Sequence, residues 1–191
     1  MNLDLDRCGQ DIKQARLRVQ SLVSDLAPDQ FTKRPEAGKW SVAECILHLN
    51  TTAEIVQSLM EKAIAEGKRS NTVGSGPFGV GFKGQLLFWI AEPPPKFRMR
   101  APKKVRPPAA INDPAKLLPD FLKAQDEWER LMREQKGLDL VKIKVGQGAF
   151  RMRLAGVVPW MMAHQRRHLL QAENVKRQIL SAAPKTVARA G

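Results

Sequence analysis

Apolar residues recur at alternating steps of three and four along most of the chain, a spacing typical of helices that bury one face. The first such segment runs from about Leu3 to Leu26, and Pro28 disfavours helical geometry in the residue before it. Its apolar seam consists of Leu5, Cys8, Ile12, Ala15, Val19, Leu22 and Leu26. We therefore predict one helix over this segment, followed by a polar loop with Pro35 and Gly38.

A second helix is predicted to begin at a capping box formed by Ser41 and Glu44. In this motif the serine hydroxyl accepts from the Glu44 amide, and the carboxylate accepts from the Ser41 amide. The helix continues to about Glu66, with these residues facing inward: Ile46, Leu49, Ala53, Val56, Met60 and Ala63. His48 lies beside this stripe in the second turn, and we therefore place it in or at the edge of the core.

The third long helix is predicted to start at Asp113 and Pro114, which suit the cap and the first helical position. Pro119 should separate or kink its first turn, and Gly137 should end it. The inward stripe consists of Leu117, Leu118, Phe121, Ala124, Trp128, Leu131 and Met132.

The last helix should run from about Val157 to Ser181, with Pro159 in its first turn, where a missing amide donor is tolerated. His164 and His168 are four residues apart, so they lie one turn apart on one face. The residues on their line are Val157, Met161, Gln171 and Val175.

The connection between the second and third long helices is unusually long. Gly67 to Gly84 is Gly-rich, lacks the spacing of a phosphate-binding loop, and is expected to be a mobile surface loop. A short apolar helix follows at Gln85 to Ala91, and then three prolines and a basic extended stretch. A link of this length can cross a bundle, so neighbouring helices need not be antiparallel.

Residues 138–154 are harder to interpret, because Val141 to Val145 alternates like a strand but has no obvious partner. We interpret this segment as an extended loop. The pattern as a whole predicts an all-α fold, a four-helix bundle with a long Gly/Pro-rich crossover between the second and third long helices. One domain is expected over residues 1–182, with a disordered tail at 183–191.

Composition narrows the class of protein. The 191 residues are 43% apolar and 27% charged, as in ordinary globular proteins, and no apolar run is long enough for a membrane helix. The start of the sequence is acidic and does not resemble a signal peptide, which makes a cytoplasmic protein the default. Cys8 and Cys45 fall on apolar faces, so two buried free thiols are favoured over a disulfide.

The formal net charge is +13, which is compatible with nucleic acid, an anionic membrane, acidic ligands or simply solvated basic faces. The densest basic stretch, residues 96–106, contains one aromatic residue, Phe97. It lacks the aromatic interleaving of a single-strand binding groove. A nucleic-acid partner is therefore not expected. The lack of an apolar run long enough for a membrane helix predicts that the chain has no membrane partner either.

The chain has three histidines, and all of them fall on core-facing positions of the second and last helices. Two interpretations remain open from the residues alone: hydrogen-bonded core histidines, or a three-nitrogen metal site. Three protein ligands leave at least one position for water or substrate, the catalytic rather than the structural pattern. Candidate partners for the second ring nitrogens are Gln171 and Glu173, whereas Glu44 is already claimed by the capping box.

Two segments resemble the motifs of the DinB/YfiT-like superfamily. Residues 39–49, Lys-Trp-Ser-Val-Ala-Glu-Cys-Ile-Leu-His-Leu, resemble the opening of its second helix. Residues 163–171, Ala-His-Gln-Arg-Arg-His-Leu-Leu-Gln, resemble its C-terminal signature, and Arg106-Pro-Pro precedes the third helix at the usual distance. The long Gly-rich and Pro-rich connection and the high charge depart from the family pattern and leave the substrate class open.

The resemblance implies a four-helix bundle that holds a divalent metal on His48, His164 and His168. Zinc or nickel are the first choices, with iron or manganese as alternatives. Members of the superfamily include transferases that use low-molecular-weight thiols, a mycothiol-dependent isomerase and proposed metal-dependent hydrolases, and many are dimers. A metal-dependent thiol transferase or hydrolase is therefore expected, acting on a small molecule, with a low-molecular-weight thiol as one candidate, and forming a homodimer. The alternative is a non-catalytic basic binding or dimerisation module on the same bundle.

No general base is identifiable in the sequence. Arg166 and Arg167 flank the histidines, but helical geometry points them away from the His164–His168 line, which predicts solvated side chains. Arg167 matches the Arg-His pair of the superfamily signature, and the resemblance therefore leaves a functional role for it open.

Overall fold

The computed structural model describes residues 1–97, 100–108, 110–148 and 151–182. The predicted tail at 183–191 lies outside the described residues. The helices are α1 (Leu5–Ser24), α2 (Pro28–Thr32), α3 (Val42–Arg69), α4 (Gly81–Ala91), α5 (Leu117–Glu134) and α6 (Leu154–Ala182). Two short 3-10 turns, η1 (Lys103–Val105) and η2 (Pro114–Lys116), and two strands, β1 (Lys144–Val145) and β2 (Met152–Arg153), complete the described elements.

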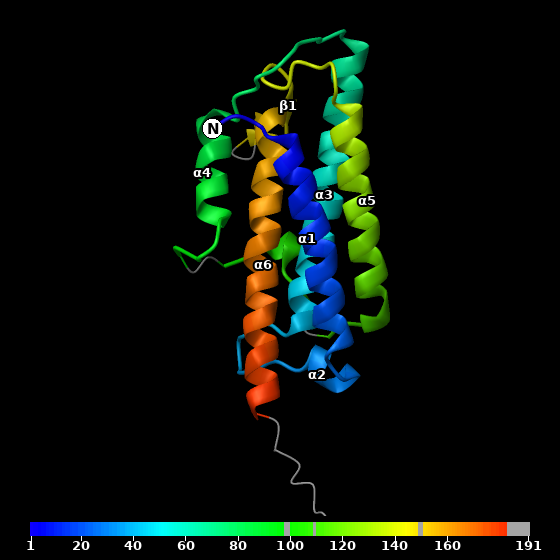
Figure 1. The fold of residues 1–191 in the computed structure, drawn as a ribbon, viewed down its shortest axis with the longest axis vertical. Helices are drawn as coiled ribbons and strands as arrows, with labels where there is room; N and C mark the ends of the chain where they lie inside the picture. Colours follow the sequence, from blue (N-terminus) through cyan, green and yellow to red (C-terminus); the bar gives the residue numbers. More distant parts are fainter. Residues whose placement is uncertain (98–99, 109, 149–150, 183–191) are drawn as a thin grey trace, which may run out of the picture.

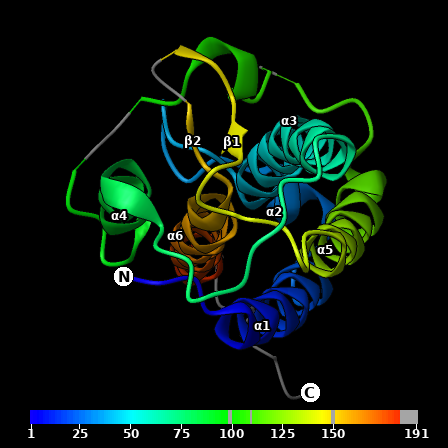
Figure 2. The ribbon, with the colours of Figure 1, turned by 90° about the horizontal axis from the view of Figure 1, so that it is seen from above.

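The long helices α1, α3, α5 and α6 form a four-helix bundle, as predicted. Helix α6 packs against α1 and α3, and α5 packs against the same two helices from the other side (Figure 2). The chain colours show that α1 and α6 run in one direction and α3 and α5 in the other (Figure 1). The adjacent helices α3 and α5 are therefore parallel, and the long connection between them, which includes α4, is what makes that arrangement possible.

The interior of the bundle divides into two apolar clusters along its length. One surrounds Trp128, Met60 and Met162, and the other surrounds Phe121, Leu22 and Ile46. Burying large apolar side chains such as these away from water contributes most of the hydrophobic stabilisation of such a fold. The two cysteines lie in these clusters as free thiols, and this confirms the prediction made for them.

The prediction of an extended loop over residues 138–154 is wrong in two respects. Strand β1 pairs with β2 in an antiparallel hairpin, with Val145 opposite Met152. Helix α6 also begins three residues earlier than expected, so Pro159 lies in its second turn. The reason is tertiary: the amides of Leu154 and Ala155 donate to the carbonyls of Ile143 and Leu140, at 3.0 Å each. These bonds satisfy the first amides of the helix and let it start ahead of the proline.

Two other local features differ from the sequence expectation. The segment after α1 is not entirely loop, because Pro28 starts the short helix α2, which buries Phe31. The short apolar helix is longer than expected, since α4 starts at Gly81 instead of Gln85. Its approach to α6 needs two glycines: a β-carbon added to Gly84 would lie 3.2 Å from the α-carbon of Gly156. Close helix packing thus fixes α4 on the outside of α6.

The Gly-rich connection before α4 is held to other parts of the fold. The Gly74 amide donates to the Gly137 carbonyl at 3.1 Å, and the Leu3 amide donates to the Phe78 carbonyl at 2.9 Å. Mobility of this loop stays a prediction. Among the described residues, no helix combines the length and the apolar character that crossing a bilayer requires.

Candidate metal centre

The fold brings the three histidines together from two helices. His48 comes from α3, and His164 and His168 come from α6, with one potential ligand atom from each lying within 4.8 Å of the other two. His48 is buried, and the other two are partly buried. Within the part of the chain that the structure describes, no other cluster of histidine, cysteine or acidic residues has such an arrangement.

Local structure on α3 orients His48. The predicted capping box is present: the Glu44 amide donates to the Ser41 hydroxyl at 3.1 Å, and the Ser41 amide donates to the Glu44 carboxylate at 2.8 Å. Arg34 forms a bidentate ion pair with the same carboxylate. The start of α3 is therefore held rigidly one turn before His48, and Glu44 has no capacity left to orient an imidazole.

Hydrogen bonds define the tautomer of two of the rings. The His48 Nδ1–H donates to the backbone carbonyl of Val105 at 2.7 Å, and a carbonyl can only accept. His168 Nδ1 lies 3.0 Å from the side-chain oxygen of Gln171, one of the partners that the sequence suggested. In both neutral rings the proton is then on Nδ1, and the Nε2 lone pair is left to face the centre of the cluster.

His164 lacks such a partner. Its Nδ1 is buried and makes no hydrogen bond among the described residues. Its Nε2 lies 3.2 Å from the Nε2 of His48. Two imidazole nitrogens bound to one tetrahedral zinc at about 2.0–2.1 Å are separated by about 3.4 Å, so this spacing fits a shared metal ion.

Electrostatics keep the three rings neutral. Burial lowers the pKa of His48, and burial together with the neighbouring His168, His48 and Arg167 holds the pKa of His164 well below its usual range. The pKa of His168 is lowered to about 3, first by burial and then by His48 and Arg167. Neutral imidazole is the form that ligates a metal, so the donor set is ready at neutral pH.

Two tryptophans border the cluster. The Trp40 ring lies 5.0 Å from the His48 ring and 6.0 Å from the His168 ring, centroid to centroid. The Trp160 ring lies 6.5 Å from His164. Apolar walls of this kind restrict water around a polar site and strengthen the interactions inside it.

The expectation that Arg166 and Arg167 are solvated is wrong. Arg166 pairs with Asp11 on α1 and with Glu92 at the end of α4. Arg167 donates to the Phe97 carbonyl at 2.7 Å and to another carbonyl near the end of α4. Both arginines therefore hold the connection between α3 and α5 against α6. Arg167 also stays close enough to the histidines to lower the pKa of His164 and His168. Sequence spacing could not show which segment these arginines would meet.

The sequence also missed Val105. Val105 is the last residue of the 3-10 turn η1 in the basic stretch, and its carbonyl accepts from His48 across 57 residues of chain. A backbone acceptor has no residue-type signature, so no pattern could have identified it. Glu173, the other suggested partner, instead pairs with Arg18 at 2.7 Å.

The bundle and its histidine cluster define a class of protein, and comparison with known families identifies it. The sequence profile of the DinB superfamily matches residues 11–172. The chain therefore belongs to the DinB superfamily. No curated protein matches it in sequence.

Among solved structures, the chain is similar to YfiT from Bacillus subtilis, which is described as a probable metal-dependent hydrolase with an unusual four-helix bundle topology. The TM-score is 0.59 over 90% of this chain and 85% of the other, with 14% identity. At that identity the likeness establishes the fold alone.

Proposed function

We propose that this protein is a metal-dependent enzyme with one divalent ion on His48, His164 and His168. The observation that carries the proposal is the convergence of imidazole nitrogens, with His48 and His168 held by Val105 and Gln171 so that their lone pairs face inward. Membership of the DinB superfamily and the likeness to YfiT support it. Zinc or nickel suits this neutral nitrogen set best, with iron or manganese as alternatives.

A divalent metal on three neutral ligands supplies Lewis acidity, which lowers the pKa of a water or thiol bound at its open position. The chain's own contribution is orientation and shielding. Val105 and Gln171 fix two rings, and Trp40 and Trp160 border the histidine cluster. The two acidic residues considered as partners, Glu44 and Glu173, are each paired with an arginine and do not serve as a free general base.

Two reaction classes fit this chemistry, hydrolysis of a small molecule and transfer of a low-molecular-weight thiol to an electrophile. Both need an anionic nucleophile at neutral pH, which a metal with an open position can provide. A cytoplasmic setting suits the transfer reaction and the two buried free thiols, since thiols stay reduced there.

Metal content tests the site directly. Protein purified without a histidine tag and exposed to zinc or nickel should hold about one equivalent, as the single group of three ligands requires. The His168→Gln variant should hold under about a tenth of that, whereas Gln178→Ala, at an exposed position on the same helix, should match the wild type. Retention of one equivalent by His168→Gln would exclude the site.

The reaction class can be separated with two assays on the metal-loaded protein. An activated ester reports hydrolysis, and an electrophilic aromatic chloride with cysteine as the thiol reports transfer. Activity above the His168→Gln variant in one assay identifies the class. Equal rates for both proteins in both assays, with metal bound, would favour the non-catalytic binding module.

A further inference from the structure

Helix α4 stands outside the four-helix bundle, against α6 (Figures 1 and 2). Its inner side is formed by small residues, Gly84 and Ala91, which are buried. Its outer side carries large apolar side chains, with Phe82 84%, Leu86 42% and Trp89 49% exposed. These positions are spaced by four and three residues, so they lie along one face of the helix.

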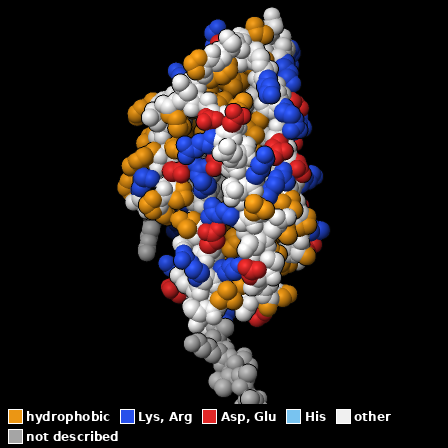
Figure 3. Space-filling model, in the orientation of Figure 1, with side chains coloured by type: hydrophobic (Ala, Val, Ile, Leu, Met, Phe, Trp, Pro, Cys, Tyr) orange, Lys and Arg blue, Asp and Glu red, His pale blue; other side chains and the backbone are white. Residues whose placement is uncertain are grey.

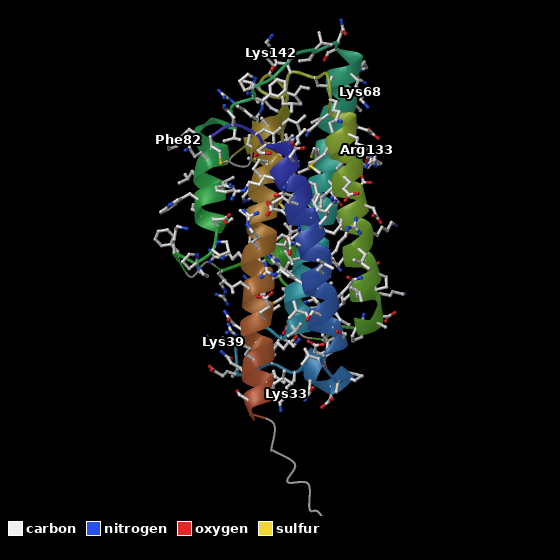
Figure 4. The ribbon with its side chains drawn as sticks, viewed as in Figure 1. Lys33, Lys39, Lys68, Phe82, Arg133 and Lys142 are labelled. Atoms are coloured by element: carbon white, nitrogen blue, oxygen red, sulfur yellow. The ribbon has the colours of Figure 1, made fainter. Side chains whose placement is uncertain are left out.

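Phe97, which is 53% exposed, extends this face beyond the end of the helix. Its ring meets that of Trp89 edge-on with 5.9 Å between centroids. We call Phe82, Leu86, Trp89 and Phe97 the α4 face. Figure 3 shows hydrophobic side chains gathered over α4, and Figure 4 shows Phe82 directed away from the bundle. A contiguous apolar patch of this kind marks a binding surface, unlike single exposed apolar residues.

The segment that carries the α4 face is mostly basic in sequence. Residues 81–106 contain seven Lys and Arg and one acidic residue, Glu92, which is paired with Arg166. The Lys96 ammonium lies 5.3 Å from the centre of the Trp89 ring, and Lys83 donates to the Arg151 carbonyl in the adjacent hairpin. This short segment therefore supplies a large part of the chain's net charge of +13.

The chemistry of this surface distinguishes among possible partners. A second copy of the chain docking face to face would bring like charges together, which costs energy. A nucleic acid strand needs a groove with rings spaced for stacking, but the α4 face is the outer side of a peripheral helix and includes an aliphatic residue. An anionic lipid surface accepts aromatic and aliphatic side chains among its acyl chains and lysines at its phosphates.

We propose that the α4 face docks the protein peripherally on membrane surfaces that carry anionic lipids. Phe82, Leu86 and Trp89 enter the interface, and Lys83 and Lys96 beside them meet the headgroups. The expectation of no membrane partner rested on the lack of a spanning segment, and a peripheral contact does not need one. The proposal does not depend on the metal centre.

Flotation of the full-length protein with lipid vesicles tests this docking. Binding to phosphatidylcholine vesicles with a third phosphatidylglycerol should exceed binding to pure phosphatidylcholine by at least about tenfold, and 0.5 M salt should remove most of the difference. Phe82→Ser/Trp89→Ser should lower binding by at least about tenfold. Leu17→Ser, which replaces a residue 60% exposed on α1, is the matched control and should bind like the wild type.

Three outcomes would overturn the proposal. The first is equal binding to both vesicle types, and the second is full binding by Phe82→Ser/Trp89→Ser. The third is a wild-type dimer that this double variant converts to a monomer without any vesicle binding, which would make the α4 face an interface between copies. Glycerol phosphate and a single-stranded oligonucleotide serve as competitors. Displacement from vesicles by either at micromolar concentration would identify a free phosphate or a nucleic acid as the true ligand.

A blue shift of tryptophan fluorescence on binding gives an independent readout, because Trp89 is the one exposed tryptophan among the described residues. The Trp89→Phe variant should bind the anionic vesicles without that shift. A shift that persists in Trp89→Phe would place the contact elsewhere and contradict the proposal.

Discussion

Two neighbouring residues of α6, His164 and Gln165, belong to two different polar sites inside the bundle. The two sites differ in how their hydrogen bonds are satisfied. Gln165 faces Gln125 of α5, and the two amides exchange hydrogen bonds at 2.9 and 3.1 Å. His164 faces His48 and His168 and leaves its Nδ1 without a partner. The glutamine pair is complete as it stands, whereas the histidine cluster leaves a buried ring nitrogen of His164 without a hydrogen bond among the described residues.

The difference gives a criterion for the role of a buried polar group, namely whether the protein itself satisfies its hydrogen bonds. Burial of a polar group is costly unless its hydrogen bonds are made. The glutamine pair meets this condition within the protein and therefore contributes to structure alone. The histidine cluster does not, and a bound ion would complete it. Four predictions test this contrast, beginning with the largest expected effect.

Breaking the glutamine pair should cost about 2–3 kcal/mol of the free energy of unfolding, whatever the metal content. The Gln125→Leu variant leaves the buried Gln165 amide without its partner. The double variant Gln125→Leu/Gln165→Leu removes both amides and should lie within about 1 kcal/mol of the wild type. Urea denaturation with and without metal measures both. A double variant less stable than the single variant would contradict the interpretation that the two amides satisfy each other's hydrogen bonds.

Removing the Gln171 acceptor should weaken metal binding by about 10–100-fold, because it releases the His168 ring. The measurement is competition with a chromophoric chelator for zinc. Gln171→Leu is the test, and Gln178→Ala, exposed on the same helix, is its control. Unchanged affinity in Gln171→Leu would mean that this hydrogen bond does not orient a ligand.

The metal-free protein should lose stability as the pH falls below 6.5. The pKa of His168 is lowered to about 3, so between these values the unfolded chain binds a proton that the folded chain does not. For this residue the loss between pH 6.5 and 5 is at most about 2 kcal/mol. The His168→Leu variant should show a shallower decline in thermal unfolding over that range. An identical slope would show that this ring titrates normally in the folded state.

In the metal-free protein, His164→Leu should be neutral or stabilising by about 1 kcal/mol, since it removes a buried nitrogen without a partner. Saturating metal should reverse this order. At a hundred times the dissociation constant the wild type gains about 2.7 kcal/mol, and the variant gains nothing. Calorimetry at both conditions gives the comparison. Stabilisation of His164→Leu by metal to the same extent would place the ion elsewhere.

Local sequence signals predicted much of this fold. The steps of three and four placed the long helices, and the capping box at Ser41 and Glu44 placed the start of α3 correctly. The same spacing put His48, His164 and His168 on core faces, and the structure brings them together. What these predictions share is that neighbours within one helix decide them.

Most of the misses depend on contacts that lie outside the helix or loop concerned. The β1–β2 hairpin and the early start of α6 come from pairing with residues 140–145. The environments of Arg166 and Arg167 come from the crossover and α1, and the Val105 acceptor is a backbone atom with no signature in the sequence. The spacing of apolar residues within one helix carries no information on these contacts.

The sequence by itself determined which residues face inward on each helix, because that depends on the helical repeat and on the free energy of apolar burial. Tertiary structure alone decided which polar groups find partners, because a hydrogen bond needs two atoms about 3 Å apart and the chain path sets that distance. This is why Gln165 and His164, adjacent in sequence and both inside the fold, differ in chemistry. One meets its complement on α5, and the other meets two more imidazoles.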